Sequence, residues 1–473
     1  MQKTIALWEM NSRVTFSDGR KKIVNLMDLS QWRLTPYQIL VLGFALLILS
    51  GAFLLTFPVA SQSGQGTPFI DALFTATSAV CVTGLVVVDT GTHYSSFGHT
   101  VIILLIQAGG LGIMAMSTLF AILIGKKIRL KERLLMQEAL NQLSIAGVVR
   151  LTIYIIKITL LIEFIGGTIL AIRWYPELGW KGVYFGYWHA VSAFCNAGFD
   201  LFGSVHGPFS GITAYVDDIT VNLTIAGLII LGGIGFAVMY DCGSSRAFKK
   251  LSLHSKIVLV TTGTLIVGGT ILIYLFEHAN PETLAPLSLQ GKWLGSFFQA
   301  VTPRTAGYNT IDIGKMYDGS LLFLIILMFI GASPASTGGG IKTSTTAVLI
   351  LAIWALIRGR NDAECFGRRI PKEHIYKAFS VMFIAFLLVI IATMALTITE
   401  HAEFINILFE VTSAFGTVGL TTGITPHLSP YGKLWLILTM FAGRVGPVTL
   451  ALAIAMRVRK AQVQYPDGKI MIG

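Results

Sequence analysis

The chain has 473 residues, of which 54% are hydrophobic and only 12% are charged. Its mean hydropathy of +0.72 excludes an ordinary soluble domain and indicates a multi-pass membrane protein. The formal net charge of +11 does not indicate affinity for nucleic acid, because Lys and Arg gather in a few polar connections, as they do in the cytoplasmic loops of membrane proteins.

The positions of the basic residues predict how the chain is oriented. Lys and Arg cluster in five segments, and the connections between these segments contain few basic residues. The clusters are residues 20–22, 126–133, 246–256, 358–377 and 457–460. The positive-inside bias therefore predicts that both termini lie in the cytoplasm. Residues 1–35 contain no long apolar run, so we expect a cytoplasmic N-terminal arm rather than a signal or an additional span.

Eight apolar runs are long enough to cross a bilayer core, which takes about 20 residues of helix. They occupy residues 36–57, 100–124, 151–172, 219–240, 257–276, 321–356, 378–398 and 433–456. Between the two runs of each pair lies a stretch of small and aromatic residues. Its helical part of about ten residues is too short to span the bilayer and suits a re-entrant helix. The sequence thus predicts an all-α polytopic membrane protein of four parallel helix–pore loop–helix repeats, with eight spans and four re-entrant pore helices around a central pore.

These repeats divide the chain into six predicted segments. They are the cytoplasmic N-terminal arm (1–35), repeat 1 (36–124), repeat 2 (125–241), repeat 3 (242–356) with an intramembrane gating loop (331–342), repeat 4 (357–456) and the cytoplasmic C-terminal tail (457–473). Because each repeat crosses the membrane twice, all four point the same way, and we expect their re-entrant helices to enter from the outer side.

A glycine closes each re-entrant stretch. By subtraction, Gly84, Gly198, Gly307 and Gly419 are separated by 114, 109 and 112 residues, which indicates an internal fourfold repeat. Glycine adopts backbone angles that other residues avoid, so the carbonyl groups around it can turn toward one axis and replace the water shell of a cation. We therefore predict a selectivity filter. Its residues are Cys81, Val82, Thr83 and Gly84, then Cys195, Asn196, Ala197 and Gly198, then Arg304, Thr305, Ala306 and Gly307, and finally Gly416, Thr417, Val418 and Gly419.

The second run of each repeat carries a glycine-rich break, which is typical either of close helix packing or of a pore-lining kink. The second run of repeat 3 is the longest. Its residues 321–356 would form about 54 Å of helix, whereas a bilayer core requires about 30 Å. A proline and a glycine triplet in its middle oppose a continuous helix, so we predict a loop that gates the permeation path. The predicted gating residues are Gly331, Ala332, Ser333, Pro334, Ala335, Ser336, Thr337, Gly338, Gly339, Gly340 and Lys342, with Arg444 of the last run.

The residues of this loop have two other interpretations. A long kinked helix with a passive break remains open as an alternative. A phosphate-binding loop is disfavoured, because Ile341 separates the glycines from Lys342 and no strand precedes them.

Three charged residues within these apolar and re-entrant stretches carry further hypotheses. Arg444 lies in the middle of the last apolar run, where a guanidinium costs about 2.5 to 3.5 kcal/mol on insertion scales. We expect it to face the interior, to hold carbonyl groups of the gating loop and to restrain the gate. The alternative is that Arg444 pairs with a buried acid for assembly. Arg304 and Glu410 lie in the third and fourth re-entrant stretches, and we expect them to form a structural charge pair behind the filter.

Four motifs in order resemble those of a known family. They are residues 74–79 with 82–85, residues 192–194 with 196–199, residues 299–307 and residues 413–420. In these motifs, and in most of its length, the chain resembles the Trk/Ktr/HKT superfamily of cation transporters, most closely the Ktr-type membrane subunits of bacterial potassium uptake. In plant relatives that conduct sodium, a serine replaces the first filter glycine, so Gly84 favours potassium.

The resemblance also implies partners and a location. It implies a homodimer with a separate pore in each subunit, embedded in the lipid of the bacterial cytoplasmic membrane. It implies a cytoplasmic RCK-type nucleotide-binding ring subunit, similar to KtrA, that drives the gating loop. Because this chain has no dinucleotide-binding motif in a βαβ context, we expect it to bind no nucleotide itself. The expected transported ion is K⁺, and a dependence on Na⁺ stays open.

The function expected from the sequence is therefore gated potassium uptake through a glycine-centred filter, and not an enzymatic reaction. A poorly selective K⁺/Na⁺ pathway is one alternative, because the residues before the glycines differ among the copies (Thr83, Ala197, Ala306 and Val418). An ion-coupled secondary carrier is another, although Glu163 is the only obvious acid in the middle of a predicted span. A membrane enzyme is disfavoured, because the nine histidines show no metal-binding spacing.

Overall fold

The computed structural model describes residues 35–112, 148–245, 247–454 and 471. The described helices all belong to one unit, Pro36–Gly473. Apart from Thr35 and Met471, the predicted N-terminal arm and C-terminal tail lie outside the described residues.

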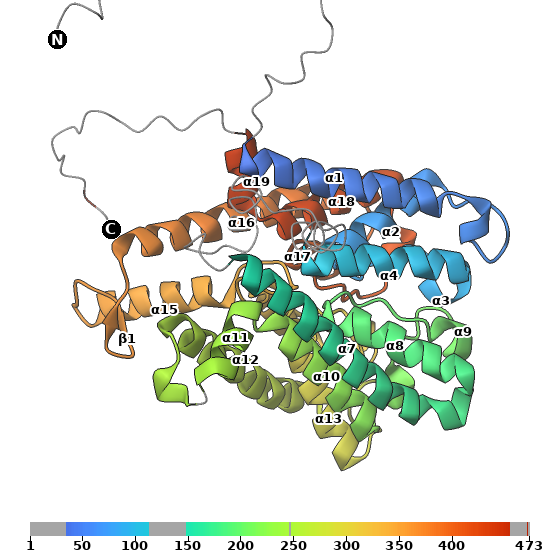
Figure 1. Ribbon diagram of the computed structural model, residues 1–473, viewed down its shortest axis with the longest axis horizontal. Helices are drawn as coiled ribbons and strands as arrows, with labels where there is room; N and C mark the ends of the chain where they lie inside the picture. Colours follow the sequence, from blue (N-terminus) through green and yellow to red (C-terminus); the bar gives the residue numbers. More distant parts are fainter. Residues whose placement is uncertain (1–34, 113–147, 246, 455–470, 472–473) are drawn as a thin grey trace, which may run out of the picture. The chain divides into compact units, whose positions relative to one another are not determined.

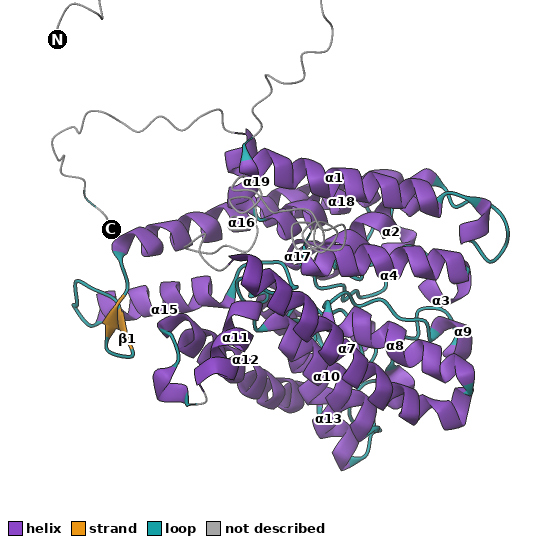
Figure 2. Cartoon of the chain, in the orientation of Figure 1, coloured by secondary structure: helices purple, strands orange, loops and turns teal. Residues whose placement is uncertain are grey.

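Helices make up nearly all of the regular structure in the described residues (Figure 2). Four long helices alternate with four short ones, and each short helix precedes a segment with a central glycine. The long helices are α1 (Pro36–Leu55), α7 (Val148–Leu178), α12 (Leu253–Glu277) and α16 (Lys372–Thr399). The short helices are α2 (Phe69–Cys81), α8 (Trp180–Phe194), α13 (Leu289–Val301) and α17 (Phe404–Gly416).

A further helix, or a broken pair of helices, comes after each glycine segment. These are α4 (Ser96–Leu111), α10 (Ile219–Gly233) with α11 (Phe236–Ser245), α14 (Asp318–Phe329) with α15 (Thr343–Ile357), and α18 (Pro430–Val445) with α19 (Pro447–Ile454). Each long helix, together with its short helix and the further helix or broken pair, is called a helix group, numbered 1 to 4. The smaller elements are α3 (Thr90–His93), α9 (Gly203–His206), and a hairpin of β1 (Glu364–Cys365) and β2 (Arg368–Arg369) between groups 3 and 4.

Polar residues define where many of these helices begin. Ser95, Asp218, Ser252, Ser288 and Ser429 each accept a hydrogen bond, through the side chain, from the backbone N–H three residues later. Such caps satisfy N–H groups that the first turn of a helix leaves unpaired. The caps therefore fix the start of α4, α10, α12, α13 and α18.

Within the described residues, α1, α7, α12 and α16 are each long and apolar enough to cross a membrane, and they coincide with the predicted first run of each pair. The predicted second runs are not continuous helices. The pair α10 and α11 bends by 97° at Gly235, whose φ is +94°, and α18 gives way to α19 at Gly446, whose φ is +92°. In group 3 the interruption is longer and comprises residues 330–342. The α4 helix ends before Gly112, and its predicted extension to residue 124 lies outside the described residues.

The four helix groups pack in a closed order. Group 1 contacts group 2 through α4 and α8, group 2 contacts group 3 through α10 and α13, and group 3 contacts group 4 through α14 and α17. The α18 helix of group 4 then packs against α2 of group 1, as the red and blue ribbons of Figure 1 show. Lys433 Nζ, at the start of α18, lies 2.7 Å from Asp71 Oδ1 in the first turn of α2. The last group thus returns to the first.

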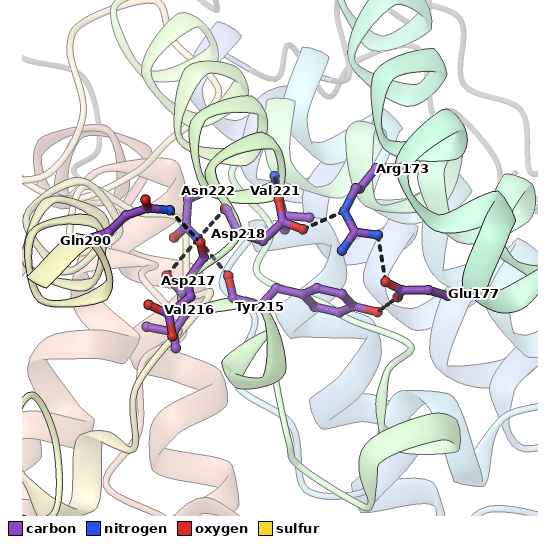
Figure 3. Close-up of polar contacts among 9 residues, drawn as sticks. All are labelled: Arg173, Glu177, Tyr215, Val216, Asp217, Asp218, Val221, Asn222 and Gln290. Atoms are coloured by element: carbon purple, nitrogen blue, oxygen red, sulfur yellow. Dashed lines mark hydrogen bonds and ion pairs between the residues drawn. The ribbon is translucent and has the colours of Figure 1, made fainter. Parts of the chain in front are cut away.

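Arg173 ties helix group 2 together, as Figure 3 shows. Its guanidinium on α7 contacts Asp218 at 2.5 Å and Glu177 at 2.6 Å. Asp218 is also the cap of α10, so one carboxylate joins the last turns of α7 to the start of α10. Gln290 of α13 donates a hydrogen bond to the carbonyl oxygen of Asp217, which fastens group 2 to group 3.

Candidate functional site

A hydroxyl group near the end of each short helix supports the glycine segment beyond it. The Ser78 and Ser413 hydroxyl oxygens accept hydrogen bonds from the backbone N–H groups of Gly84 (3.0 Å) and Gly419 (3.1 Å). In groups 2 and 3 the direction is reversed. The Ser192 hydroxyl donates to the carbonyl oxygen of Phe199 at 2.9 Å, and the Thr302 hydroxyl donates to that of Tyr308 at 2.6 Å. The four glycine segments, residues 81–84, 195–198, 304–307 and 416–419, are therefore held to their own helices.

The backbone has the same unusual form in all four glycine segments. The residue two places before each central glycine is left-handed, with φ of +58° at Val82, +58° at Asn196, +72° at Thr305 and +51° at Thr417. Each central glycine also has positive φ, between +70° and +92°. A residue other than glycine in a sparsely populated backbone region costs about 1 to 3 kcal/mol, so four such residues at one position indicate a constraint on where the carbonyl groups point.

The central glycines lie against one another in a closed ring. A methyl group built on Gly84 would lie 2.5 Å from the carbonyl oxygen of Ala197, and one on Gly198 would lie 2.6 Å from that of Ala306. A methyl group on Gly307 would lie 2.5 Å from the carbonyl oxygen of Val418, and one on Gly419 would meet that of Thr83. Each glycine therefore faces the carbonyl oxygen that precedes the next glycine, and no position of the ring has room for a side chain.

The 331–342 loop between α14 and α15 lies against three of the glycine segments. The Thr337 hydroxyl donates to Asn196 Oδ1 at 3.1 Å, and the backbone N–H of Gly339 donates to the Thr417 hydroxyl at 3.0 Å. A methyl group on Gly338 would meet the Thr305 hydroxyl. The loop therefore contacts the left-handed residues of groups 2, 3 and 4. The glycines at 338 and 339 allow this close approach, because they have no side chain.

Further bonds hold the loop in its folded form. The Lys342 ammonium group donates to the carbonyl oxygens of Gly338 at 2.7 Å and Gly339 at 3.1 Å. The Ser333 and Thr343 hydroxyl groups are 2.9 Å apart and join the two ends of the loop. The backbone N–H of Ser333 donates to the carbonyl oxygen of Gly233 at 3.0 Å, so the loop also rests on the broken helix of group 2.

Arg444 joins this loop to two helix groups. Its guanidinium, near the end of α18, donates to the carbonyl oxygen of Thr337 in the loop and to that of Gly109 near the end of α4. A weaker contact reaches the carbonyl oxygen of Gly110 at 3.4 Å. Among the described residues, the ion pairs do not include Arg444, so its partners are backbone carbonyl groups rather than a buried acid.

A family model described as TrkH, a cation transport protein, matches residues 30–464. The chain belongs to the TrkH family of cation transport proteins. It is 46% identical over 444 residues to the Ktr system potassium uptake protein B of Bacillus subtilis, with 93% of this chain and 97% of that protein covered. It is 43% identical over 448 residues to the potassium/sodium uptake protein NtpJ of Enterococcus hirae, with 93% and 98% covered. The resemblance seen in the sequence motifs is thereby confirmed, and the protein is a member of the Ktr/Trk potassium uptake transporters.

A solved structure supports the same fold. The potassium transporter TrkH from Vibrio parahaemolyticus superimposes with a TM-score of 0.68, over 92% of this chain and 87% of that one. Because the sequence identity is only 17%, this likeness concerns the helical fold of the TrkH family member and not its individual residues.

One predicted contact in this Ktr/Trk transporter differs from the expectation. Glu410 accepts hydrogen bonds from the hydroxyl groups of Thr421, at 2.8 Å, and of Thr425. Arg304 is buried, its Nε atom has no hydrogen-bond partner among the described residues, and no ion pair joins it to Glu410 there. The predicted charge pair is therefore wrong in this structure, because hydroxyl groups of the segment after the fourth glycine already satisfy the carboxylate.

Sequence reasoning missed the supporting hydroxyl groups at positions 78, 192, 302 and 413. The sequence did contain a pattern that could have identified them, since a Ser or Thr lies five or six residues before each central glycine. Sequence reasoning also left Glu163 without a role. Gln107 Nε2 donates to Glu163 Oε2 at 3.2 Å, and the Cys195 thiol lies 3.9 Å from Oε1. The one mid-span acid singled out in the sequence of this TrkH family member thus contacts the second glycine segment at Cys195.

Two carboxylates lie just beyond the first and second glycine segments. Asp89 accepts from the backbone N–H of Thr92 at 2.8 Å and from that of Phe209 at 2.8 Å. Asp200 accepts from the backbone N–H of Phe202 at 3.0 Å. Burial, with the neighbouring charge of Asp89 adding to it, raises the pKa of Asp200 to about 7. This carboxyl group therefore changes its charge near neutral pH.

Proposed function

We propose that this Ktr/Trk transporter admits K⁺ through the ring of glycine segments, which acts as its selectivity filter. The observation that carries the proposal is the closed contact of Gly84, Gly198, Gly307 and Gly419, together with the left-handed residue that precedes each of them by two positions. A similar backbone in four segments, arranged about one axis, presents carbonyl oxygens that replace the water shell of a cation.

The short helices then serve as re-entrant pore helices. In each helix the C-terminal end, which carries the negative end of the helix dipole, leads into the filter and so favours a cation there. With both termini in the cytoplasm, as the basic clusters predict, the filter opens to the outside and the 331–342 loop lies on its cytoplasmic side. Each helix group then corresponds to one of the four predicted repeats, and each carries one quarter of the pore.

The 331–342 loop serves as the gate. Its bonds to Asn196 and Thr417 support a position directly below the filter, where it obstructs the path of the ion. Arg444 restrains it there, because one guanidinium bonds both the loop at Thr337 and α4 at Gly109. Opening requires that these bonds break and that the loop moves aside. The guanidinium has to withdraw as well, because its positive charge repels a cation that passes close to it.

A cytoplasmic partner supplies the signal for opening. The relative from Bacillus subtilis is named as part of a Ktr system, which supports a transporter of more than one component. We expect an RCK-type, KtrA-like ring that binds the nucleotide and acts on a homodimer of this chain in the bacterial cytoplasmic membrane. This chain would itself bind only the transported ion.

A less selective pathway for K⁺ and Na⁺ is the second candidate. The relative NtpJ is named a potassium/sodium uptake protein. In addition, the residues whose carbonyl oxygens meet the next glycine are Thr83, Ala197, Ala306 and Val418, so the side chains behind the ring are not equivalent. A coupled entry of Na⁺ belongs to the same candidate.

Rubidium uptake into proteoliposomes tests both candidates. The protein is reconstituted without partners, and rubidium uptake is competed with K⁺ or Na⁺, for the unaltered chain and for Gly84→Ser. Because a side chain at residue 84 meets the carbonyl oxygen of Ala197 at 2.5 Å, we expect the variant to lose preference for K⁺. Gly359→Ser is the matched control, since residue 359 also has positive φ (+67°) but has no other atom within 4 Å of an added methyl group.

The outcomes separate the candidates. Strong competition by K⁺ and weak competition by Na⁺ supports the potassium filter, whereas equal competition supports the less selective pathway. If K⁺ and Na⁺ compete with rubidium uptake by Gly84→Ser as they do with uptake by the unaltered protein, the glycine ring is not the filter.

A further inference from the structure

The hairpin of β1 and β2 joins α15 to α16 and lies beside the end of α15 (Figure 1). Ala363 before β1 and Ile370 after β2 are buried, and they pack with Ala355 near the end of α15 and with Ile375 in the first turn of α16. The backbone N–H of Ile370 donates to the carbonyl oxygen of Ala363 at 2.9 Å. The hairpin is therefore fixed against the ends of both helices.

Three apolar helices begin or end at the level of this hairpin. Both α12 and α16 are long and apolar enough to cross a membrane. Lys256, in the first turn of α12, has its Nζ atom 5.9 Å from the centroid of the Phe366 ring at the hairpin tip. The last two residues of α15, Leu356 and Ile357, are 77% and 71% exposed. Because membrane helices expose such side chains to lipid, the hairpin lies at the membrane surface, on the side that the basic clusters predict to be cytoplasmic.

Two aromatic side chains are exposed at the hairpin tip. Phe366 is 48% exposed and Phe248 is 47% exposed, and their ring centroids are 6.0 Å apart. The turn of the hairpin consists of Phe366 and Gly367, with φ of +48° and +72°. A turn with two such angles favours Asn-Gly, and a positive φ is unusual for a bulky side chain. The turn therefore presents an aromatic ring where neither the backbone conformation nor burial favours one.

Three lysines accompany the two rings. Lys249 and Lys250 follow Phe248 directly and are exposed. The Lys256 ammonium group, which lies over the Phe366 ring, donates to the carbonyl oxygen of Lys249 at 2.9 Å. In the part of the chain that the structure describes, the ion pairs include none of these three lysines. We call Phe248, Lys249, Lys250, Lys256 and Phe366 the hairpin patch.

Neighbouring carboxylates do not neutralise the hairpin patch. Residues 247–256 contain no acidic residue. The Asp241 carboxylate accepts from the backbone N–H of Ser252 at 3.0 Å and from the Ser255 hydroxyl at 2.6 Å, so it supports the start of α12. The two carboxylates of the hairpin, Asp362 and Glu364, are paired with arginines. The patch thus combines three positive charges with two exposed rings.

We propose that the hairpin patch binds the headgroup of an anionic phospholipid in the cytoplasmic leaflet. Lysine ammonium groups near a membrane surface attract anionic headgroups, and aromatic rings enter the boundary between headgroups and acyl chains. An acidic protein surface would also attract the lysines, but the exposed apolar end of α15 and the start of two membrane helices beside the patch favour lipid. The inference goes beyond the proposed uptake function and does not depend on which ion the filter selects.

The first experiment measures which lipid lies next to the hairpin. Cys365 in β1 is partly exposed, and a fluorophore is attached to it in a Cys242→Ser chain, since the other two cysteines are buried. The protein is reconstituted into phosphatidylcholine vesicles that contain nitroxide-labelled phosphatidylglycerol or nitroxide-labelled phosphatidylcholine. We expect stronger quenching by the anionic lipid. One basic side chain near an anionic surface changes binding by about five-fold, so Lys256→Gln should lower the preference about five-fold.

Lys181→Gln is the matched control for Lys256→Gln. Lys181 Nζ also lies over an aromatic ring, 5.2 Å from the centroid of Phe185, but that ring is buried and Lys181 does not belong to a basic cluster. We expect the control to keep the preference for phosphatidylglycerol. A variant with Lys249→Gln and Lys250→Gln changes only exposed side chains, so it folds even if Lys256→Gln does not, and it should also lose the preference.

The second experiment tests the ring at the hairpin tip. Phe366→Asn supplies the residue that the turn favours, so the hairpin is retained while the ring is lost. We expect weaker quenching by a nitroxide placed near the headgroup end of the acyl chain. Phe209→Asn is the matched control, because Phe209 also has a positive φ (+59°) and is 47% exposed but lies outside the hairpin patch. It should leave the quenching unchanged.

Three results would overturn the proposal. The first is equal quenching by the two lipids in the otherwise unaltered protein. The second is an equal loss of preference in Lys256→Gln and Lys181→Gln, which would reflect the total charge of the protein and not the hairpin patch. The third is unchanged quenching in the lysine variants together with weaker binding of a cytoplasmic partner protein, which would make the patch a protein docking surface.

Discussion

Removal of the Arg444 guanidinium should release the 331–342 loop. The two shorter hydrogen bonds from this cation, to the carbonyl oxygens of Thr337 and Gly109, each have a charged donor, and such bonds contribute about 1.5 to 3 kcal/mol. Because Arg444 is half-buried, we take the lower value, which gives about 3 kcal/mol for the pair. That free energy corresponds to a change of about 150-fold in the equilibrium between the held and the released loop.

Rubidium uptake by Arg444→Ala in proteoliposomes, without any regulatory subunit, measures this release. We expect faster uptake than for the unaltered chain, up to the limit set by the filter. Arg444→Lys separates two explanations, because lysine retains the positive charge but not the planar fork that reaches two carbonyl groups. If the guanidinium is a tether, the lysine variant is intermediate, and if only its charge matters, that variant behaves as the unaltered protein. Unchanged or slower uptake by a correctly folded Arg444→Ala would refute the restraint.

Three smaller predictions concern stability and pH. Glu277→Gln should destabilise the protein by about 2 to 3 kcal/mol, because the buried carboxylate accepts four hydrogen bonds, three of them fully buried, and its thermal unfolding should be compared with that of the exposed control Glu282→Gln. Asp71→Asn removes the charge opposite Lys433, and because the two side chains are only 17% and 14% exposed, it should cost more than the roughly 1 kcal/mol of an exposed ion pair; a smaller loss would mean that the closure of the groups does not depend on this pair. Potassium uptake should rise as the pH rises through about 7, where Asp200 ionises, and Asp200→Asn should flatten this profile. Because the pKa of Asp200 is raised by folding, its contribution to stability is complete below the ordinary pKa of an aspartate and is lost as the pH rises to about 7.

The positions of the long helices were predictable from the sequence, because the lipid bilayer restricts which segments can cross it. A bilayer core requires long apolar helices, and α1, α7, α12 and α16 fall where the apolar runs predict them. The breaks in the helices after the glycine segments were also signalled, since Gly235 and Gly446 have the positive φ that glycine adopts most readily. The number of residues in each break was not predictable, because it depends on which groups the freed backbone bonds.

Side-chain partners were the part that the sequence could not supply. Glu410 and Arg304 are both charged and both close to a central glycine, which suggested a pair. In the structure, hydroxyl groups at residues 421 and 425 reach the carboxylate instead. A choice among several polar partners depends on distances of a few ångströms, and a helical pattern constrains only the face on which a side chain lies.

The contact of the last helix with the first has a consequence for how the gene can be arranged. Gln38 Nε2 at the start of α1 donates to the carbonyl oxygen of Ala453 at the end of α19, over 3.3 Å, so the two ends of the helical array are spatial neighbours. A circular permutant that joins these ends by a short peptide and opens the chain in the hairpin between β1 and β2 should still assemble. The packing of the four helix groups then does not depend on which two neighbouring groups are joined by a peptide bond, and any group could come first in the chain.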